Sequence, residues 1–357
     1  MKTCSLLVAA FLSAVRPVAA ADFTDLGLKD ASGQAAPASV AGAPVCVPAG
    51  VEPSSVSLQD QFPDGPFRQQ RASDCHDYAA VGVLEAAYFR KYREKVHFSE
   101  PDLFLGRTVL NPDFQHAALT GRPKSRADDV LAALRDQEGG EEAVDVQYAL
   151  DHGIARDPQY ERFAKRYELE LAAQAKTIAS INANSGSWWE RLLLDPRAYY
   201  EKLQNDPGRR RSLERYLLGR DCSAERAEVK AKLAGFKMRT MTFPVVPLNK
   251  DVLTGLEPYL ASGIAQGNAI MAELKRGRPV AIGMRIEGLE DWGQKGVTQE
   301  VDHAFLITGY RRDPVGLRVF ETRNSFGGKN AEVYEFDFRR IDTVTTLLTP
   351  EEAAAEK

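Results

Sequence analysis

The chain has 357 residues, of which 44% are hydrophobic and 27% are charged, and these fractions are ordinary for a globular protein. The formal net charge of -4 at pH 7 argues against nucleic acid as a main partner. Behind the first residues no stretch is long and apolar enough for a membrane-spanning helix, so we expect no membrane insertion of the mature chain.

The N-terminus has the pattern of a secretory signal peptide. Lys2 precedes a mostly apolar run, and small residues follow that run, with cleavage expected near Ala20 or Ala21. Residues 1–21 are therefore predicted to be removed on export, which places the protein outside the cell or in a periplasm. Residues 22–55 are rich in Ala, Pro, Gly and Ser and are predicted to form an extended lead-in.

Residues 56–156 are predicted to form a helical lobe. Apolar and aromatic residues recur every three or four positions behind Cys75, as on the buried face of a helix. Cys75 itself stands at the junction between a loop and this helix. The unpaired N–H groups and the partial positive charge of a first helical turn favour a thiolate over a thiol, so this position is suited to a nucleophile.

A helical insertion is predicted for residues 157–240. Three Asp-Pro pairs place an N-cap residue before a first-turn proline: Asp157-Pro158, Asp195-Pro196 and Asp206-Pro207. Two roles are open for this segment. It either packs as scaffold on the rest of the protein or borders the substrate groove, where Trp188, Trp189, Tyr199 and Tyr200 could cover an apolar surface.

Residues 241–342 contain short alternating or apolar runs between Gly and Pro signals, and they are predicted to form a β-rich lobe. Residues 343–357 end in a Glu- and Ala-rich stretch and are predicted to be a frayed tail.

The cysteines divide by compartment. Cys4 leaves with the signal peptide, and Cys75 must stay reduced if it is a nucleophile. Cys46 and Cys222 then remain as one pair in an oxidising compartment, which predicts a disulfide between them. Two unrelated thiols are the alternative.

Three further residues would supply the other groups that hydrolysis at Cys75 needs. His303 is predicted to act as general base and acid, and Asn324 to orient its imidazole without adding charge. Gln69 is predicted to donate a hydrogen bond to the developing oxyanion, with Gln70 as a rival for that role.

Five segments in the same chain order resemble the papain family of cysteine peptidases. Besides the region of Cys75 they are Ser99–Leu103, Gly139-Gly140 followed by Asp151–Ile154, Pro279–Ile282 before His303, and Asn324–Gly327. The resemblance covers roughly residues 55–155 and 265–340. The chain departs from the family pattern at Ala72 and His76, where the family has Cys and Trp.

The resemblance implies an α+β fold of two lobes, with a helical lobe that carries Cys75 and an antiparallel, barrel-like β lobe that carries His303 and Asn324. Gly139 and Gly140 would pair with an extended substrate, since glycine permits a close approach of backbones. The full set of expected substrate-binding residues is Gly139, Gly140, Gly283, Asp302, Ala304 and Phe326.

No metal or other cofactor is predicted. His76 and Asp77 follow the nucleophile, but adjacent helical residues diverge by about 100°, which disfavours joint ligation.

The sequence therefore predicts an exported cysteine endopeptidase that acts on a peptide or protein substrate through a Cys-His-Asn triad. Two alternatives remain: an amidase with a restricted non-protein substrate, and a non-catalytic peptide- or protein-binding module. The sequence leaves the oligomeric state open.

Overall fold

The computed structural model describes residues 29–30, 55–63, 74–110, 126–135, 138–156, 160–184, 206–243, 252–286, 301–314, 316–323, 325, 331–334 and 341–356. The predicted signal peptide and Cys46 lie outside this part of the chain. So do Gln69, Asn324 and Phe326.

The described residues form one antiparallel sheet of eight strands. The strands are β1 (Lys29–Asp30), β2 (Ser55–Ser57), β3 (Lys237–Thr242), β4 (Val280–Ile286), β5 (Val301–Arg312), β6 (Arg318–Arg323), β7 (Ala331–Tyr334) and β8 (Ile341–Leu348). Their order is β1-β7-β6-β5-β4-β8-β3, and β2 pairs with β5 beside this path.

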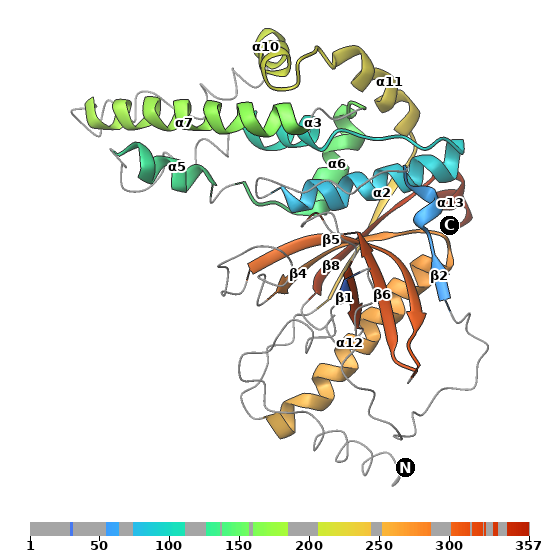
Figure 1. Ribbon diagram of the computed structural model, residues 1–357. Helices are drawn as coiled ribbons and strands as arrows, with labels where there is room; N and C mark the ends of the chain where they lie inside the picture. The colour runs from blue at the N-terminus through green and yellow to red at the C-terminus, as the bar shows by residue number, and fades with distance from the viewer. Residues whose placement is uncertain are drawn as a thin grey trace.

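The sheet is open, so the prediction of a barrel-like β lobe is wrong. Closing a barrel requires the two end strands to pair, and within the described residues β1 and β3 do not. Instead, helices cover the two faces of the open sheet (Figure 1).

The helices confirm the α+β class. They are α2 (Cys75–Tyr92), α3 (Glu100–Phe104), the π-helical turn η3 (Leu105–Val109), α5 (Ala127–Arg135), α6 (Glu142–His152), α7 (Tyr160–Asn184), α10 (Pro207–Leu217), α11 (Ser223–Leu233), α12 (Val252–Lys275), α13 (Pro350–Ala355) and the 3-10 turn η2 (Gln59–Gln61). The predicted cap at Asp206-Pro207 is confirmed, because the Asp206 carboxylate accepts a hydrogen bond from Gly208 N at 2.8 Å.

Two apolar clusters place the sheet between helices. Ala304 and Leu306 of β5 pack toward α2, whereas Phe305 and Ile307 pack toward α12. This alternation follows from the two-residue period of a strand, which turns successive side chains to opposite faces. The strand that carries His303 is therefore buried on both faces, with α2 above it and α12 below it in Figure 1.

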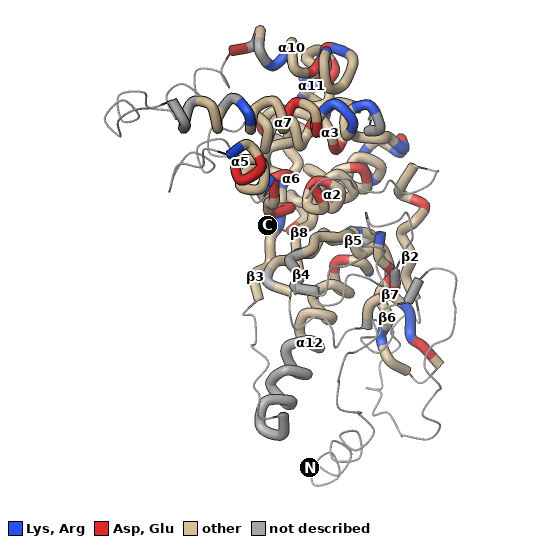
Figure 2. The backbone as a smooth tube through the Cα atoms, turned by 60° about the vertical axis from the view of Figure 1, so that its left-hand side comes forward, with Lys and Arg blue, Asp and Glu red and all other residues tan. Residues whose placement is uncertain are grey.

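The helices of the predicted insertion extend the α2 side of the molecule. Residues of α7 and α10 share one apolar cluster with residues of α3, η3 and α5. Figure 2 shows basic and acidic residues interspersed along these outer helices, while the strands beneath are mostly uncharged. No helix in the described part of the chain has the length and apolar character needed to span a bilayer.

The last predicted boundaries differ from the structure. Residues 343–357, expected to be a tail, contain most of β8, which lies between β4 and β3, and then α13. Val344 and Leu347 are fully buried, and Thr349 caps α13 in a capping box with Glu352. Hydrophobic burial and the cap therefore order this segment. The composition of its final residues alone predicts a frayed end.

Candidate active site

Cys75 lies where the first turn of α2 meets strand β5. It is the first residue of α2, and it is partly exposed. Its Sγ accepts a hydrogen bond from the backbone N–H of Ala304 at 3.5 Å. The helix and the strand thus bring the predicted nucleophile against the residue that follows His303, although 229 positions separate Cys75 from Ala304.

His303 and the predicted pocket residues lie on two paired strands. In the register of β4 and β5, Gly283 pairs with Ala304 and Met284 pairs with His303. Only 2% of His303 is exposed, and its ring lies 5.9 Å from that of Phe305, centroid to centroid. The structure therefore brings Cys75, Ala304 and Gly283 into one region, and His303 is adjacent to it in the chain.

One strand pair and one hydrogen bond connect the Gly139-Gly140 segment to the same region. Gly283 also pairs with Thr343 of β8, whose hydroxyl donates a hydrogen bond to Glu142 Oε1 at 2.9 Å. Glu142 is the first residue of α6, directly behind the glycine segment. Both glycines are exposed, which leaves their backbone open to a bound chain.

The two glycines differ in their surroundings. A Cβ on Gly139 would meet no atom of the described residues within 4 Å. A Cβ on Gly140 would lie 2.8 Å from His76 Cε1 and 2.6 Å from Arg107 Nη2. Gly139 faces open space, whereas Gly140 lies tightly against His76, which follows Cys75 in the chain.

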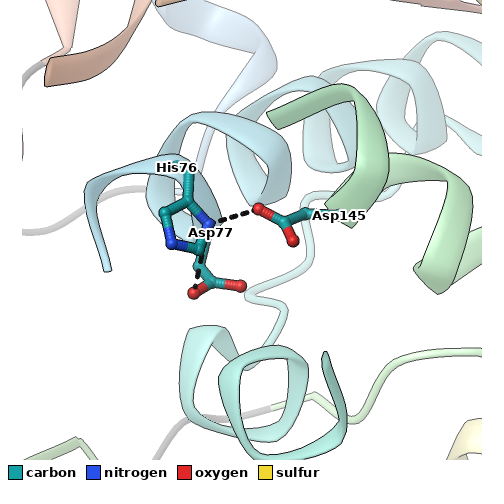
Figure 3. Close-up of side chains that lie close together, drawn as sticks. All are labelled: His76, Asp77 and Asp145. Carbon is teal, nitrogen blue, oxygen red and sulfur yellow. Dashed lines mark hydrogen bonds and ion pairs between the residues drawn. The ribbon is translucent and has the colours of Figure 1, made fainter. Parts of the chain in front are cut away.

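His76, Asp77 and Asp145 form a buried polar cluster, and the first two directly follow Cys75 in the chain (Figure 3). His76 Nδ1 contacts the carboxylate of Asp145 on α6 and lies 3.6 Å from Asp77 Oδ2. Arg107 forms an ion pair with the other oxygen of Asp145, with 2.9 Å between Nε and Oδ1. The side chains of His76 and Asp77 thus lie close to each other, and the expected divergence of these two neighbours is wrong at this helix start.

The pKa of the Cys75 thiol corrects a second expectation. Burial of the sulfur is the main cause, and together with the carboxylates of Asp74 and Asp77 it raises this pKa to about 12. The N–H groups of Ala304 and His76 oppose the shift but do not outweigh it. The free protein therefore holds Cys75 as a thiol, and this sulfur would need a base to take its proton before it could act as a nucleophile.

Four of the predicted catalytic and substrate-binding residues have no described side chain. Gln69, Asn324 and Phe326 lie outside the described residues, and Asp302 lies on β5 but only its backbone is described. Ser325, next to Asn324, is 2% exposed.

Cys222 is buried and has a free thiol, so the structure does not support the predicted disulfide with Cys46, which lies outside the described residues. Cys222 packs among the apolar residues of the outer helices, and its backbone N–H donates to Glu214 Oε2 at 3.0 Å.

Among the described residues, His76, Asp77 and Asp145 are the group whose ligand atoms lie close enough to hold a metal ion, within 4.8 Å of one another. Sequence reasoning missed Asp145, Glu138 and Arg107. Asp145 had one local signal, because it is a carboxylate between Val144 and Val146 in a helix, but nothing in the sequence pairs it with His76.

No family model matches the chain, and no curated protein matches it. Among solved structures, it is similar to the crystal structure of PepW from Lactobacillus rhamnosis HN001 (DR20), determined as the selenomethionine derivative. The two are 13% identical over 84% of this chain and 82% of that chain, with a TM-score of 0.45. A similarity of this degree supports no inference about activity.

Proposed function

We propose that this protein is an exported, papain-like cysteine endopeptidase with Cys75 as its nucleophile. The observation that carries the proposal is the contact between Cys75 Sγ and Ala304 N, which joins two motifs far apart in the sequence. A nucleophile and a histidine from different layers of the fold are typical of enzymes whose site lies between two structural halves.

The reaction begins with proton transfer from the thiol to His303, because the raised pKa of Cys75 leaves little preformed thiolate. The sulfur attacks the peptide carbonyl, and Gln69 with the backbone N–H of Cys75 stabilises the oxyanion. The C–N bond then breaks, and the amine leaves with the proton from His303. Water hydrolyses the remaining thioester and regenerates the thiol.

Substrate binding uses the open glycine segment and the strand row beside Cys75. An extended chain pairs with the backbone at Gly139, which has free space around it. The family resemblance places the paired residues Gly283 and Ala304 at the wall of the adjacent pocket, where glycine and alanine would leave room for a large substrate residue.

Our first prediction tests this mechanism by single substitutions. Cys75→Ala and His303→Ala should each lower hydrolysis of unstructured peptides by more than about 10³-fold, and Asn324→Ala by less, because Cys and His act as one unit while Asn orients the imidazole. Hydrolysis is measured by mass spectrometry over a peptide panel, with folding checked by circular dichroism.

The matched control is Cys222→Ala, which removes the other described thiol, 1% exposed, and should leave activity unchanged. A peptide epoxide should label Cys75 and not Cys222. Wild-type turnover in Cys75→Ala would refute the nucleophile. Labelling of Cys75 without cleavage of any peptide would favour a binding module or an amidase with another substrate.

A further inference from the structure

The buried imidazole of His76 faces two hydrogen-bond acceptors. Its Nε2 lies 3.0 Å from the carbonyl oxygen of Glu138, and its Nδ1 contacts the carboxylate of Asp145. A carbonyl oxygen only accepts, so Nε2 carries a proton. Nδ1 faces an Asp145 oxygen, and the guanidinium of Arg107 pairs with the other oxygen of the same side chain, so Nδ1 donates and carries a proton as well. This geometry requires His76 in its charged imidazolium form.

The surrounding charges agree with this protonation state. Burial opposes a charge on His76, but the carboxylates of Asp77 and Asp145 outweigh it and raise the pKa of His76 to about 10. The charge is fixed at neutral pH, and both hydrogen bonds are therefore charge-assisted.

These hydrogen bonds hold the glycine segment from both sides. Glu138 directly precedes Gly139, and Asp145 belongs to the first turns of α6, which follows Gly140. Between these two anchors the imidazole lies so close to Gly140 that a Cβ there would be 2.8 Å from Cε1. A second bond supports the first anchor, since Tyr167 of α7 donates to Glu138 Oε1 at 2.9 Å.

We propose that His76 is a positioning residue that fixes the Gly139-Gly140 segment against the start of the Cys75 helix. His76 follows Cys75 in the chain, so the same helical turn carries the nucleophile and the side chain that holds the substrate-binding backbone. The proposal rests on the function proposed above. It assigns a role to a residue at which the chain departs from the family resemblance.

A bound metal ion is the competing interpretation of the same side chains. Within the described part of the chain, both oxygens of Asp77 are buried without a hydrogen-bond partner, and a cation between Asp77, Asp145 and His76 would satisfy them. It would also require an unprotonated Nδ1, which conflicts with the contact between Nδ1 and the Asp145 carboxylate, and it would place a second cation beside Arg107.

The experiment compares His76→Gln with His152→Gln, a substitution at the exposed end of α6 outside the cluster. Three quantities are measured: KM and kcat for an extended peptide, the alkylation rate of Cys75 by iodoacetamide, and hydrogen exchange of the amides of residues 138–141. Iodoacetamide is small and needs no substrate-binding backbone, so it reports on the thiol alone.

We expect His76→Gln to raise KM by about 10-fold or more, as follows from losing hydrogen bonds to a charged group, and to speed amide exchange at residues 138–141 by a similar factor. Alkylation should change by less than about 2-fold, and His152→Gln should change none of the three. Unchanged KM and exchange, or a fall in alkylation that parallels a fall in kcat, would overturn the positioning role.

Two further measurements keep the test decisive. If His76→Gln does not fold, Asp145→Asn removes the same anchor with little change of shape and should give the same pattern. Stoichiometric zinc in the purified protein, lost on Asp77→Asn, would overturn the imidazolium assignment. If the wild type cleaves no peptide, the proposed function fails, but the exchange of residues 138–141 still decides whether His76 holds the segment.

Discussion

At the scale of single residues, Gly139 and Gly140 should respond differently to the same change. Gly140→Ala places a Cβ against His76 and Arg107, and we expect it to cost about 1–3 kcal/mol because neither neighbour is free to move away. Gly139→Ala meets open space and should change stability by less than about 1 kcal/mol.

The activity of the two variants separates structure from substrate binding. Because a methyl group at Gly139 occupies the space where a substrate backbone approaches, Gly139→Ala should still lower kcat/KM for extended peptides. Urea denaturation and peptide hydrolysis check both expectations. Equal stability losses at the two positions would show that the closeness of His76 and Arg107 is not the reason for a glycine at position 140.

The residues of the candidate site differ in how far the sequence could reveal them. Cys75 was predicted at a loop-to-helix junction because that signal is local, and the structure places it in the first turn of α2. Its thiol pKa was not predicted correctly, since the shift depends on burial and on Asp74 and Asp77 in three dimensions. The partnership of His76 with Asp145 joins residues 69 positions apart, and no local pattern encodes it.

At the scale of elements, one buried ionic network attaches the outer helices to α3. Arg226 of α11 donates to Asp102 Oδ1 at 2.7 Å and pairs with Glu214 of α10 at 2.6 Å. Asp102 also accepts from Ala155 N at 2.8 Å. The side chains of Arg226, Asp102 and Glu214 are 8%, 1% and 0% exposed, so the network lies in a poorly solvated place. Removing Arg226 leaves Arg210, which lies 2.8 Å from Glu214 and 3.6 Å from Asp102, as the cation beside both carboxylates.

We therefore predict that Arg226→Leu lowers the free energy of unfolding by about 1.5–3 kcal/mol, because charged hydrogen bonds are lost while Arg210 still pairs with Glu214. The matched control is Arg135→Leu, because Arg135 pairs with Glu168 at 2.6 Å but both side chains are about half exposed. That exposed pair should contribute less than about 1 kcal/mol. Chemical denaturation of both variants measures the difference, and equal losses would mean that the buried network does not hold the helices together.

The sequence predicted some elements well and others poorly, for identifiable reasons. The N-cap at Asp206 was predicted because Asp followed by Pro acts within one helical turn. The end of the chain was not, because β8 is ordered by pairing with β3 and β4, which lie far away in sequence. The open sheet also depends on which strands pair, and alternation alone does not encode that choice.

At the scale of the whole molecule, the distance between helix α2 and strand β5 sets the geometry of the candidate site. Cys75 and Gly82 lie seven residues apart on α2 and therefore on one helical face. Ala304 and Leu306 lie two residues apart on β5 and therefore on one face of the sheet. Cys75 contacts Ala304, and a Cβ on Gly82 would lie 2.6 Å from Leu306 Cδ2, so both contacts belong to one interface.

This arrangement gives a prediction that links packing to catalysis. Gly82→Val should push α2 away from β5, because Leu306 is 1% exposed and packs in the core between helix and sheet, where it has little room to yield. We expect a stability loss of about 1–3 kcal/mol from overpacking. We also expect a fall in kcat under conditions where the protein stays folded, since the sulfur moves relative to Ala304 and His303.

A double substitution tests whether the effect arises at that contact. Leu306→Ala alone should cost about 2–5 kcal/mol through the cavity it leaves. In that background Gly82→Val fills part of the cavity, so its own cost should shrink or change sign, with a coupling free energy of about 0.5–3 kcal/mol. The kcat of the double variant should then exceed that of Gly82→Val. Additive stability losses with no recovery of kcat would show that the spacing of α2 and β5 at Gly82 does not govern the position of Cys75.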